Sequence, residues 1–292
     1  MLKIIPSIVR RTFPKRDPET QKWSYGHCLV IAGSKNLLGA AVLTTRAALK
    51  GGAGLVTLAL PESLQKLVYL KLAPALTLPL KETRDGTVDF GALGKVLAYI
   101  KDRKITSVVL GPGLTYQKDT KQFVHALVSR VGIPLVLDAD AINAKPKIKK
   151  QNVFCCLTPH YKEFARFLGV DPQDVVANGD VHARKLTRAH SGLVVVLKGP
   201  NTKIVAKDGT WVNRTGNAGM AKGGSGDVLA GLLGSFLAQK RDYPSYLHSV
   251  LSAVYLHGLA GDLAVRDLSE VAVNAEDILN YLPKAFKKIG IR

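Results

Sequence analysis

Residues 27–60 read HCLVIAGSKNLLGAAVLTTRAALKGGAGLVTLAL and predict a strand, a helix and a second strand in succession. The two ends, residues 27–32 and 54–60, are short and almost wholly apolar runs, as buried strands are. Between them, apolar residues recur at the spacing of one helix face: Leu38, Ala41, Val42, Ala48 and Leu49. Gly51 and Gly52 then supply a C-terminal stop for the predicted helix.

The same alternation continues along most of the chain. Further strands are expected at residues 107–110, 135–137, 153–157 and 193–197, and the helical stretch 91–101 precedes the first of them. Strands that are apolar throughout and separated by helices indicate a mostly parallel sheet covered on both faces. We therefore predict an α/β protein with three layers, α/β/α.

The final third of the chain has a different character. Residues 204–212, with Asp208-Gly209 inside them, predict a β-hairpin. A long helix is expected to begin near Ser225, and more helix follows at residues 246–264. The sequence has no low-complexity linker and no internal repeat, so we expect one domain over residues 1–292, with residues 1–24 packing on it as an extension.

The composition indicates a globular protein of the cytoplasm. Of the residues, 47% are hydrophobic and 22% charged, and no run approaches the ~18 apolar residues of a membrane helix. Pro6 interrupts the apolar start of the chain, and no cleavage-like site follows it. The three cysteines lack metal-site spacing, and Cys155 and Cys156 are expected to point to opposite faces of a buried strand.

The formal net charge of +19 is the main indication of a nucleic-acid partner. The basic residues are scattered along the chain, however, and neither an RRM nor a zinc-finger pattern occurs. A positive field would also attract anionic dinucleotides and ADP, and a basic solvated surface or a basic cellular context is the favoured explanation of the charge. We expect no nucleic-acid partner and no membrane partner.

The segment with the clearest chemistry is GNAGMAKGGSGD, residues 216–227, which runs directly into the apolar helical stretch 228–237. Small residues allow backbone N–H groups to approach an anion, and the N-terminus of a helix adds a favourable dipole. Asp227, in the first helical turn, is expected to stay ionised and to accept a proton from a hydroxyl that attacks a bound phosphate. The alternative is a tight turn with an acidic residue at a helix N-terminus.

Other polar residues follow the ends of predicted strands, where open α/β sheets bind their ligands. His160 follows residues 153–157, and its alternative is a structural histidine. Asp138 and Asp140 follow residues 135–137 and would either join a Mg²⁺ shell or cap a helix. The turn at residues 198–202 is a candidate for holding a nucleotide. Residues 33–41 match neither a Walker A loop nor a Rossmann fingerprint.

Together these segments resemble ADP/ATP-dependent NAD(P)H-hydrate dehydratases of the ribokinase-like superfamily. The glycine loop is similar to the family signature GxPGMATGGSGD. The other matching segments follow in the family's order over roughly residues 25–283: GAA at 39–41 with RAAL at 46–49 and GAGLVT at 52–57, GPG at 111–113, DAD at 138–140, TPH at 158–160, KG at 198–199 and YLHGLAGD at 255–262.

The resemblance implies a ribokinase-like fold and a repair reaction. NADH or NADPH that has added water, NADHX or NADPHX, is phosphorylated on its 6-hydroxyl by ADP or ATP, and loss of phosphate restores the ring. Mg²⁺ would bridge the transferred phosphate, although no metal ligand is assigned. The family also implies a homo-oligomer, a tetramer.

The resemblance assigns residues to each part of the site, taken position by position. Asp227 would be the catalytic base. The residues that would contact the hydrated dinucleotide are Ala40, Gly113, His160 and Asp227. The residues that would hold ADP or AMP are Lys198, Gly199, Pro200, Asn201, Thr202 and Gly226. The backbone amides of Gly224, Ser225, Gly226 and Asp227 would form the anion hole.

The sequence departs from the family pattern at three places. Lys222 stands where threonine is usual, so it would either contact ADP or point to solvent. Ala218 stands where proline is usual, and Trp23 follows Lys22 where the family prefers glycine. The epimerase domain fused to many bacterial members is not expected, because the motifs start by residue 25. Epimerase activity would then lie on another chain, or the enzyme would act on one epimer only.

Two other functions remain open on the sequence alone. A small-molecule kinase of the same superfamily, acting on a hydroxymethylpyrimidine or thiazole alcohol, would use the same loop and base, but residues 158–160 and 39–41 favour the dehydratase. A non-catalytic family member is disfavoured by the intact pair Gly226-Asp227. The preferences for ADP or ATP, and for NADHX or NADPHX, stay undecided.

Overall fold

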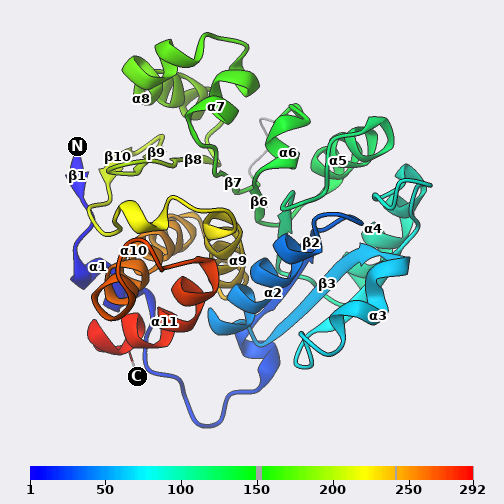
Figure 1. The fold of residues 1–292 in the computed structure, drawn as a ribbon, viewed down its shortest axis with the longest axis horizontal. Helices are drawn as coiled ribbons and strands as arrows, with labels where there is room; N and C mark the ends of the chain where they lie inside the picture. Colours follow the sequence, from blue (N-terminus) through cyan, green and yellow to red (C-terminus); the bar gives the residue numbers. More distant parts are fainter. Residues whose placement is uncertain (149–152, 241, 292) are drawn as a thin grey trace.

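The computed structural model describes residues 1–148, 153–240 and 242–291. Its centre is one ten-stranded sheet with the strand order β1-β10-β9-β8-β7-β6-β5-β2-β3-β4 (Figure 1). Seven consecutive strands of this sheet are parallel to one another: β8 (Leu193–Leu197), β7 (Cys155–Leu157), β6 (Leu135–Leu137), β5 (Ser107–Leu110), β2 (His27–Ile31), β3 (Leu55–Pro61) and β4 (Leu76–Leu80). The predicted parallel α/β/α fold is therefore confirmed.

The antiparallel edge of the sheet is the predicted hairpin. Strands β9 (Lys203–Ala206) and β10 (Gly209–Val212) pair with Gly209 opposite Ala206, and β9 pairs antiparallel with β8. The short strand β1 (Leu2–Lys3) lies parallel to β10, and helix α1 (Pro6–Thr12) packs against α10 (Tyr243–Leu268). In that contact Ser252 Oγ donates to Thr12 Oγ1 at 2.9 Å.

Helices cover both faces of the sheet, as Figure 1 shows. On one face lie α2 (Leu38–Lys50), α9 (Ser225–Ala238), α10 and α11 (Ala275–Lys288), with α1 and the short α3 (Gln65–Val68) beside them. On the other lie α4 (Leu93–Asp102), α5 (Lys118–Arg130), α6 (Asp140–Asn143), α7 (Tyr161–Leu168) and α8 (Pro172–Ala189).

The alternation of side chains along each strand divides the core into two halves. Cys156 belongs to the half beneath α9 and α10, whereas the adjacent Cys155 belongs to the half beneath α5 and α7. All three cysteines are buried and free. Cys155 and Cys156 are both buried because successive residues of a strand point to opposite faces and both faces of this sheet are covered. The prediction for this pair is confirmed.

Helix α9 is held against the sheet and α2 by close backbone contacts. A Cβ on Gly231 would lie 2.0 Å from the carbonyl oxygen of Thr44, and one on Gly234 would lie 2.1 Å from Cγ2 of Val109. Only glycine permits this approach, so α9 lies unusually close to β5 and α2. Its N-terminus, which carries the glycine loop, is thereby fixed at the edge of the sheet where the parallel strands end.

The sequence predictions differ from the structure at several element ends, and they gave no range for helices α5, α8 and α11. The helix expected from residue 91 begins as a 3₁₀ turn, Phe90–Ala92, in which Asp89 accepts a hydrogen bond from Gly91. Residues 153 and 154 precede β7 instead of belonging to it. Strand β4 was not predicted, because Pro79 interrupts its pattern and it forms the sheet's outer edge.

A search of the described residues for a helix long and apolar enough to cross a membrane found none.

Candidate active site

The expected site residues follow the carboxyl ends of neighbouring parallel strands. Gly113 follows β5, Asp138 follows β6, His160 follows β7 and Lys198 follows β8, so the topology gathers them at one edge of the sheet. The N-terminus of α9 lies at the same edge, since a Cβ on Gly226 would lie 3.2 Å from Lys198 Nζ and 3.9 Å from Asp138 Oδ2.

The glycine loop is anchored by a carboxylate of α10. Gly216 N and Asn217 Nδ2 each donate to Asp262 at 3.0 Å, and Asn217 Oδ1 accepts from Gly219 N at 3.0 Å. Asp262 is the last residue of the family-like segment at 255–262, whose contribution the sequence alone did not explain. These bonds hold the loop in place independently of any ligand.

Helix α9 begins at Ser225 without a side-chain cap. Its N-cap residue, Gly224, has φ 90°, a left-handed conformation that favours glycine. No side chain in the described part of the chain caps the first N–H groups of this helix. The N–H of Ser225 makes a long contact with the carbonyl oxygen of Lys222 at 3.4 Å, whereas those of Gly224 and Gly226 are available to an anion, as the anion-hole prediction requires.

An ion pair fixes the centre of the site. Lys198 Nζ lies 2.8 Å from Asp138 Oδ1, and Thr158 Oγ1 donates to the same oxygen at 2.6 Å. Burial by itself lowers the pKa of Lys198, but the carboxylates of Asp138 and Glu163 outweigh it and raise that pKa above its usual value. Lys198 therefore stays protonated, and a Cβ on Gly226 would press on its ammonium group.

Asp227 has an unusual protonation equilibrium. Burial, reinforced by the nearby charge of Asp138, raises its pKa to about 7, while Lys198 opposes the shift. We expected the helix N-terminus to keep this group ionised, but neighbouring carboxylates and burial outweigh that effect. A carboxylate whose pKa is close to neutrality is well matched to take and release a proton.

The backbone between the two other acidic residues is strained. Ala139 has φ 46° and ψ −113°, which a non-glycine residue rarely adopts. Asp140 Oδ2 accepts from Thr115 N at 2.8 Å, so its side chain secures the loop after β5. Burial raises the pKa of Asp140. The sequence left two roles open for Asp138 and Asp140, a place in a Mg²⁺ shell or a helix cap. Neither aspartate caps a helix in the described part of the chain.

His160 is the N-cap of α7. Its Nδ1 accepts from Glu163 N at 3.3 Å, and its own N–H donates to Glu163 Oε2 at 2.9 Å, which completes a capping box. Burial lowers the pKa of His160, so the ring is neutral and carries its proton on Nε2. The side chain is 46% exposed, and Nε2 lies 3.5 Å from Glu163 Oε1.

Ala40 and Gly113 lie directly against each other. Gly113 has φ 64°, and a Cβ built on it would lie 3.0 Å from Ala40 Cβ and 2.8 Å from the carbonyl oxygen of Leu37. The start of α2 and the loop after β5 therefore meet here with no space for a larger side chain. The structure thus brings together two of the residues expected to contact the dinucleotide.

The turn after β8 is closed by its own hydrogen bonds. Thr202 Oγ1 donates to Gly199 O at 3.0 Å, and Asn201 has φ 53°. Gly199 packs on the ring of Tyr161, where a Cβ would lie 2.6 Å from Cε2. Pro200 and Asn201 are exposed at the tip of the turn. The turn adjoins Lys198, and through it Gly226, so the nucleotide-binding residues predicted from the resemblance are close together.

Two further residues show roles that the sequence did not indicate. Lys222 donates to the carbonyl oxygen of Val271 between α10 and α11, so it neither faces the anion site nor points freely to solvent. Buried His257 approaches the carbonyl oxygen of Ser225 through Nε2 at 2.9 Å, and burial lowers its pKa to about 4. The neutral ring supports the first turn of α9. Both contacts join residues far apart in sequence.

Comparison with known proteins agrees with this geometry. A family model described as NAD(P)H-hydrate dehydratase matches residues 28–284. The ADP-dependent (S)-NAD(P)H-hydrate dehydratase of Bacillus subtilis is 34% identical over 96% of this chain and 96% of its own length. A crystal structure of the Bacillus subtilis ADP/ATP-dependent dehydratase, co-crystallized with ATP/Mg²⁺, has a TM-score of 0.83 at 31% identity and covers 99% of this chain and 98% of its own.

Longer relatives also match. The bifunctional NAD(P)H-hydrate repair enzyme Nnr of Moorella thermoacetica is 36% identical over 96% of this chain, but the match covers 53% of its own length. The chain therefore spans about half the length of the bifunctional relatives that it matches.

Proposed function

The chain belongs to the NAD(P)H-hydrate dehydratase family. From this premise we propose that it converts (S)-hydrated NADH and NADPH, called NADHX and NADPHX, back to NADH and NADPH, with ADP as the co-substrate. The products would be NADH or NADPH, AMP and phosphate. The observation that carries this proposal is the position of Asp227, a carboxylate with a raised pKa in the first turn of an uncapped helix that follows the glycine loop.

In the first step the 6-hydroxyl of the hydrated ring would attack the β-phosphorus of ADP. Asp227 would accept the hydroxyl proton as the new O–P bond forms and the bond from the β-phosphorus to the bridging oxygen breaks, releasing AMP. The backbone N–H groups of Gly224, Ser225 and Gly226 would stabilise the negative charge on the transferred group. In the second step the C6–O bond would break and phosphate would leave with that oxygen, while C5 loses a proton and the ring double bond returns.

The substrate would approach from the side of Ala40 and Gly113, with His160 Nε2–H as a hydrogen-bond donor. ADP would lie on the turn of Gly199, Pro200, Asn201 and Thr202. Lys198, between the turn and Gly226, would place a positive charge beside the phosphates. Support comes from the contacts that unite these residues at one sheet edge.

The carboxylates of the site fit a magnesium ion. Asp138 and Asp140 both raise the pKa of Asp227, so these groups repel one another when ionised, and a divalent cation would relieve that repulsion. Asp138 Oδ1 is engaged by Lys198 and Thr158, which leaves Oδ2 on the side of Gly226. Mg²⁺ is usually held by one or two carboxylates plus substrate phosphates. Asp138 would hold the ion through Oδ2, which leaves Asp227 free to act as the base, and the ion would neutralise charge on the transferred phosphate.

A direct assay tests the proposal. The purified protein is mixed with hydrated NADH, Mg²⁺ and either ADP or ATP, and the returning near-ultraviolet absorbance of the dihydronicotinamide ring is followed. We expect absorbance recovery with ADP, in step with release of AMP and phosphate. If no hydrate is converted while a hydroxymethylpyrimidine or thiazole alcohol is phosphorylated, the protein is a small-molecule kinase of the same superfamily instead.

A further inference from the structure

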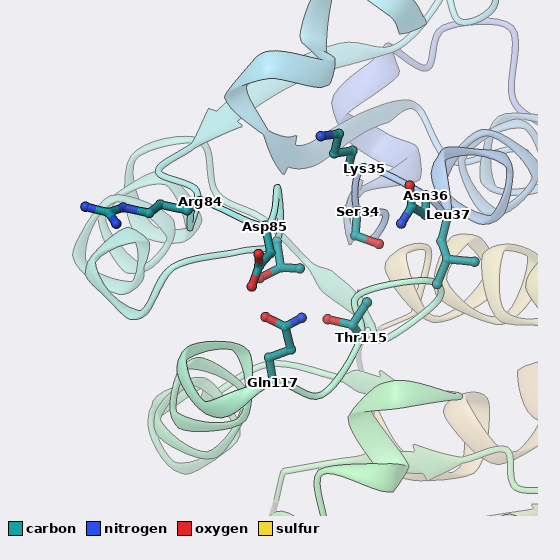
Figure 2. Close-up of a pocket in the computed structure, with 9 residues that line it drawn as sticks. Ser34, Lys35, Asn36, Leu37, Arg84, Asp85, Thr115 and Gln117 are labelled. Atoms are coloured by element: carbon teal, nitrogen blue, oxygen red, sulfur yellow. The ribbon is translucent and has the colours of Figure 1, made fainter.

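A polar cavity of about 600 Å³ lies next to the predicted substrate residues (Figure 2). Leu37 lines it and also contacts Gly113, whose Cβ would lie 2.8 Å from the Leu37 carbonyl oxygen. Thr115, two residues beyond Gly113, lines the same cavity. The cavity therefore adjoins the contact between Gly113 and Ala40, and no residue assigned above lies in it.

Two buried hydroxyl groups in this cavity have no hydrogen-bond partner. Ser34 is 2% exposed, and neither its Oγ nor Thr115 Oγ1 makes a hydrogen bond within the described part of the chain. Buried hydroxyls are nearly always paired, since an unpaired one loses its hydration without compensation. Both oxygens have almost no accessible surface, so they border the cavity without facing into it.

The backbone at Thr115 gives support for a ligand site. Thr115 has φ 62°, which is a marked outlier for a β-branched residue, and its N–H is held by Asp140 Oδ2 at 2.8 Å. Such strain persists where surrounding contacts enforce it, and it gathers at ligand sites. Here the enforcing contact comes from an aspartate of the candidate active site itself.

Asp85 supplies the carboxylate of this cavity, whose lining also includes Lys35 and Arg84. Asp85 lies at the tip of a tight turn that is held in place by Thr83 N donating to Thr87 O at 2.9 Å and Lys35 N donating to Gly86 O at 2.9 Å. Among residues that the structure describes, none makes a hydrogen bond or ion pair with the Asp85 carboxylate. Figure 2 shows Ser34, Asp85, Thr115 and Gln117 converging on one space, whereas the Arg84 guanidinium points away from it.

The carboxylate of Asp85 and the carboxamide of Gln117 suit a ligand that is rich in hydroxyl groups. We propose that this cavity binds the adenosine ribose of the hydrated dinucleotide, and that Asp85 accepts hydrogen bonds from its 2′- and 3′-hydroxyls. The assignment rests on the proposed function, because the reacting ring must then lie at Asp227 and the distant half of the dinucleotide must extend beyond Ala40 and Gly113. A carboxylate that binds the ribose diol is a general device of NAD recognition, and it repels a 2′-phosphate. The enzyme therefore prefers NADHX to NADPHX.

The test compares kcat/KM for NADHX and NADPHX in the wild-type protein, Asp85→Ser and a matched control, Asp102→Ser. Asp102 is an exposed carboxylate at the end of α4, on the side where strand β5 begins, so it lies at the opposite edge of the sheet. The wild-type protein should prefer NADHX. Asp85→Ser should lower kcat/KM for NADHX roughly 10- to 100-fold, the range for a lost charge-assisted hydrogen bond, and remove the preference. Asp102→Ser should leave the preference unchanged.

A third substrate separates hydrogen bonding from general charge repulsion. Hydrated NADH that lacks the adenosine 2′-hydroxyl should be a poorer substrate than NADHX for the wild-type protein but an equal one for Asp85→Ser. The assignment is wrong, while the dehydratase function stands, if Asp85→Ser leaves the ratio of kcat/KM for NADHX to that for NADPHX unchanged. It is also wrong if removing the 2′-hydroxyl lowers kcat/KM equally in both proteins. If the wild-type protein converts neither hydrate, the proposed function is wrong and this assignment with it.

Discussion

Replacing Lys198 with methionine removes the cation that pairs with Asp138 at the centre of the site. Asp138 is almost completely buried, with 2% of its side chain exposed, and Lys198 is 21% exposed. At a separation of 2.8 Å and an effective dielectric constant near 20, the attraction between the two charges is about 6 kcal/mol. The cost of removing both ions from water offsets part of this, so the net value of the pair is smaller.

The substitution matters because it leaves a buried charge without its partner. Breaking a buried pair in this way costs about 3–5 kcal/mol of unfolding free energy. Thr158 still donates to Asp138 Oδ1, so we expect a loss near the lower limit, about 3 kcal/mol. The loss is measured by urea unfolding without nucleotide, followed by circular dichroism.

Two control variants make the measurement specific. Lys284→Met breaks an exposed pair with Asp267, whose side chains are 61% and 52% exposed, and should cost less than about 1 kcal/mol. The double variant Lys198→Met/Asp138→Asn removes the unpaired charge and should recover most of the stability. Lys198 does not stabilise the buried charge of Asp138 if Lys198→Met lowers the free energy of unfolding no more than Lys284→Met does. The same follows if the double variant is as unstable as Lys198→Met.

Three other predictions concern protonation, the loop lysine and the capping histidine. Only the carboxylate form of Asp227 accepts a proton, and its pKa is raised to about 7. Well below pH 7, kcat/KM for NADHX should therefore fall about tenfold for each pH unit. A flat pH profile down to about pH 5 would contradict this. Lys222→Met should cost less than about 1 kcal/mol of stability and leave the KM for ADP within about twofold, because Lys222 donates to Val271; a large rise in that KM would place the lysine on the nucleotide instead. His160→Ala removes the N-cap of α7, so it should lower the free energy of unfolding by about 0.5–2 kcal/mol and raise the KM for NADHX. His160→Asn keeps a capping side chain and should restore the stability but not the KM. A normal KM in His160→Asn would exclude contact between His160 and the substrate.

The parallel half of the fold could be predicted because its strands are buried on both faces. Continuous apolar runs such as residues 193–197 carry that information locally, and glycines mark where the neighbouring helices end. Strand β1 has no such signal. Its two residues are exposed and pair with β10, more than half the chain away, so only the complete fold defines it.

Candidate residues for the site could be proposed from the sequence, but the contacts among them could not. Asp138 and Lys198 are 60 positions apart, and no spacing rule relates an aspartate after one strand to a lysine after another. Ala139 has a positive φ, which alanine as a residue type does not predict. The raised pKa of Asp227 depends on burial and on Asp138, which a local view of the helix N-terminus leaves out.

The variant Asp227→Asn tests whether Asp227 is the base for phosphoryl transfer. Asparagine keeps the shape of the side chain but cannot take the hydroxyl proton, so kcat with NADHX and ADP should fall by about 10²–10⁴. The affinity for ADP, measured by calorimetry on the same protein, should be retained or slightly increased, because a negative charge near the phosphates disappears. If Asp227→Asn retains more than about a tenth of the wild-type kcat, Asp227 is not the base.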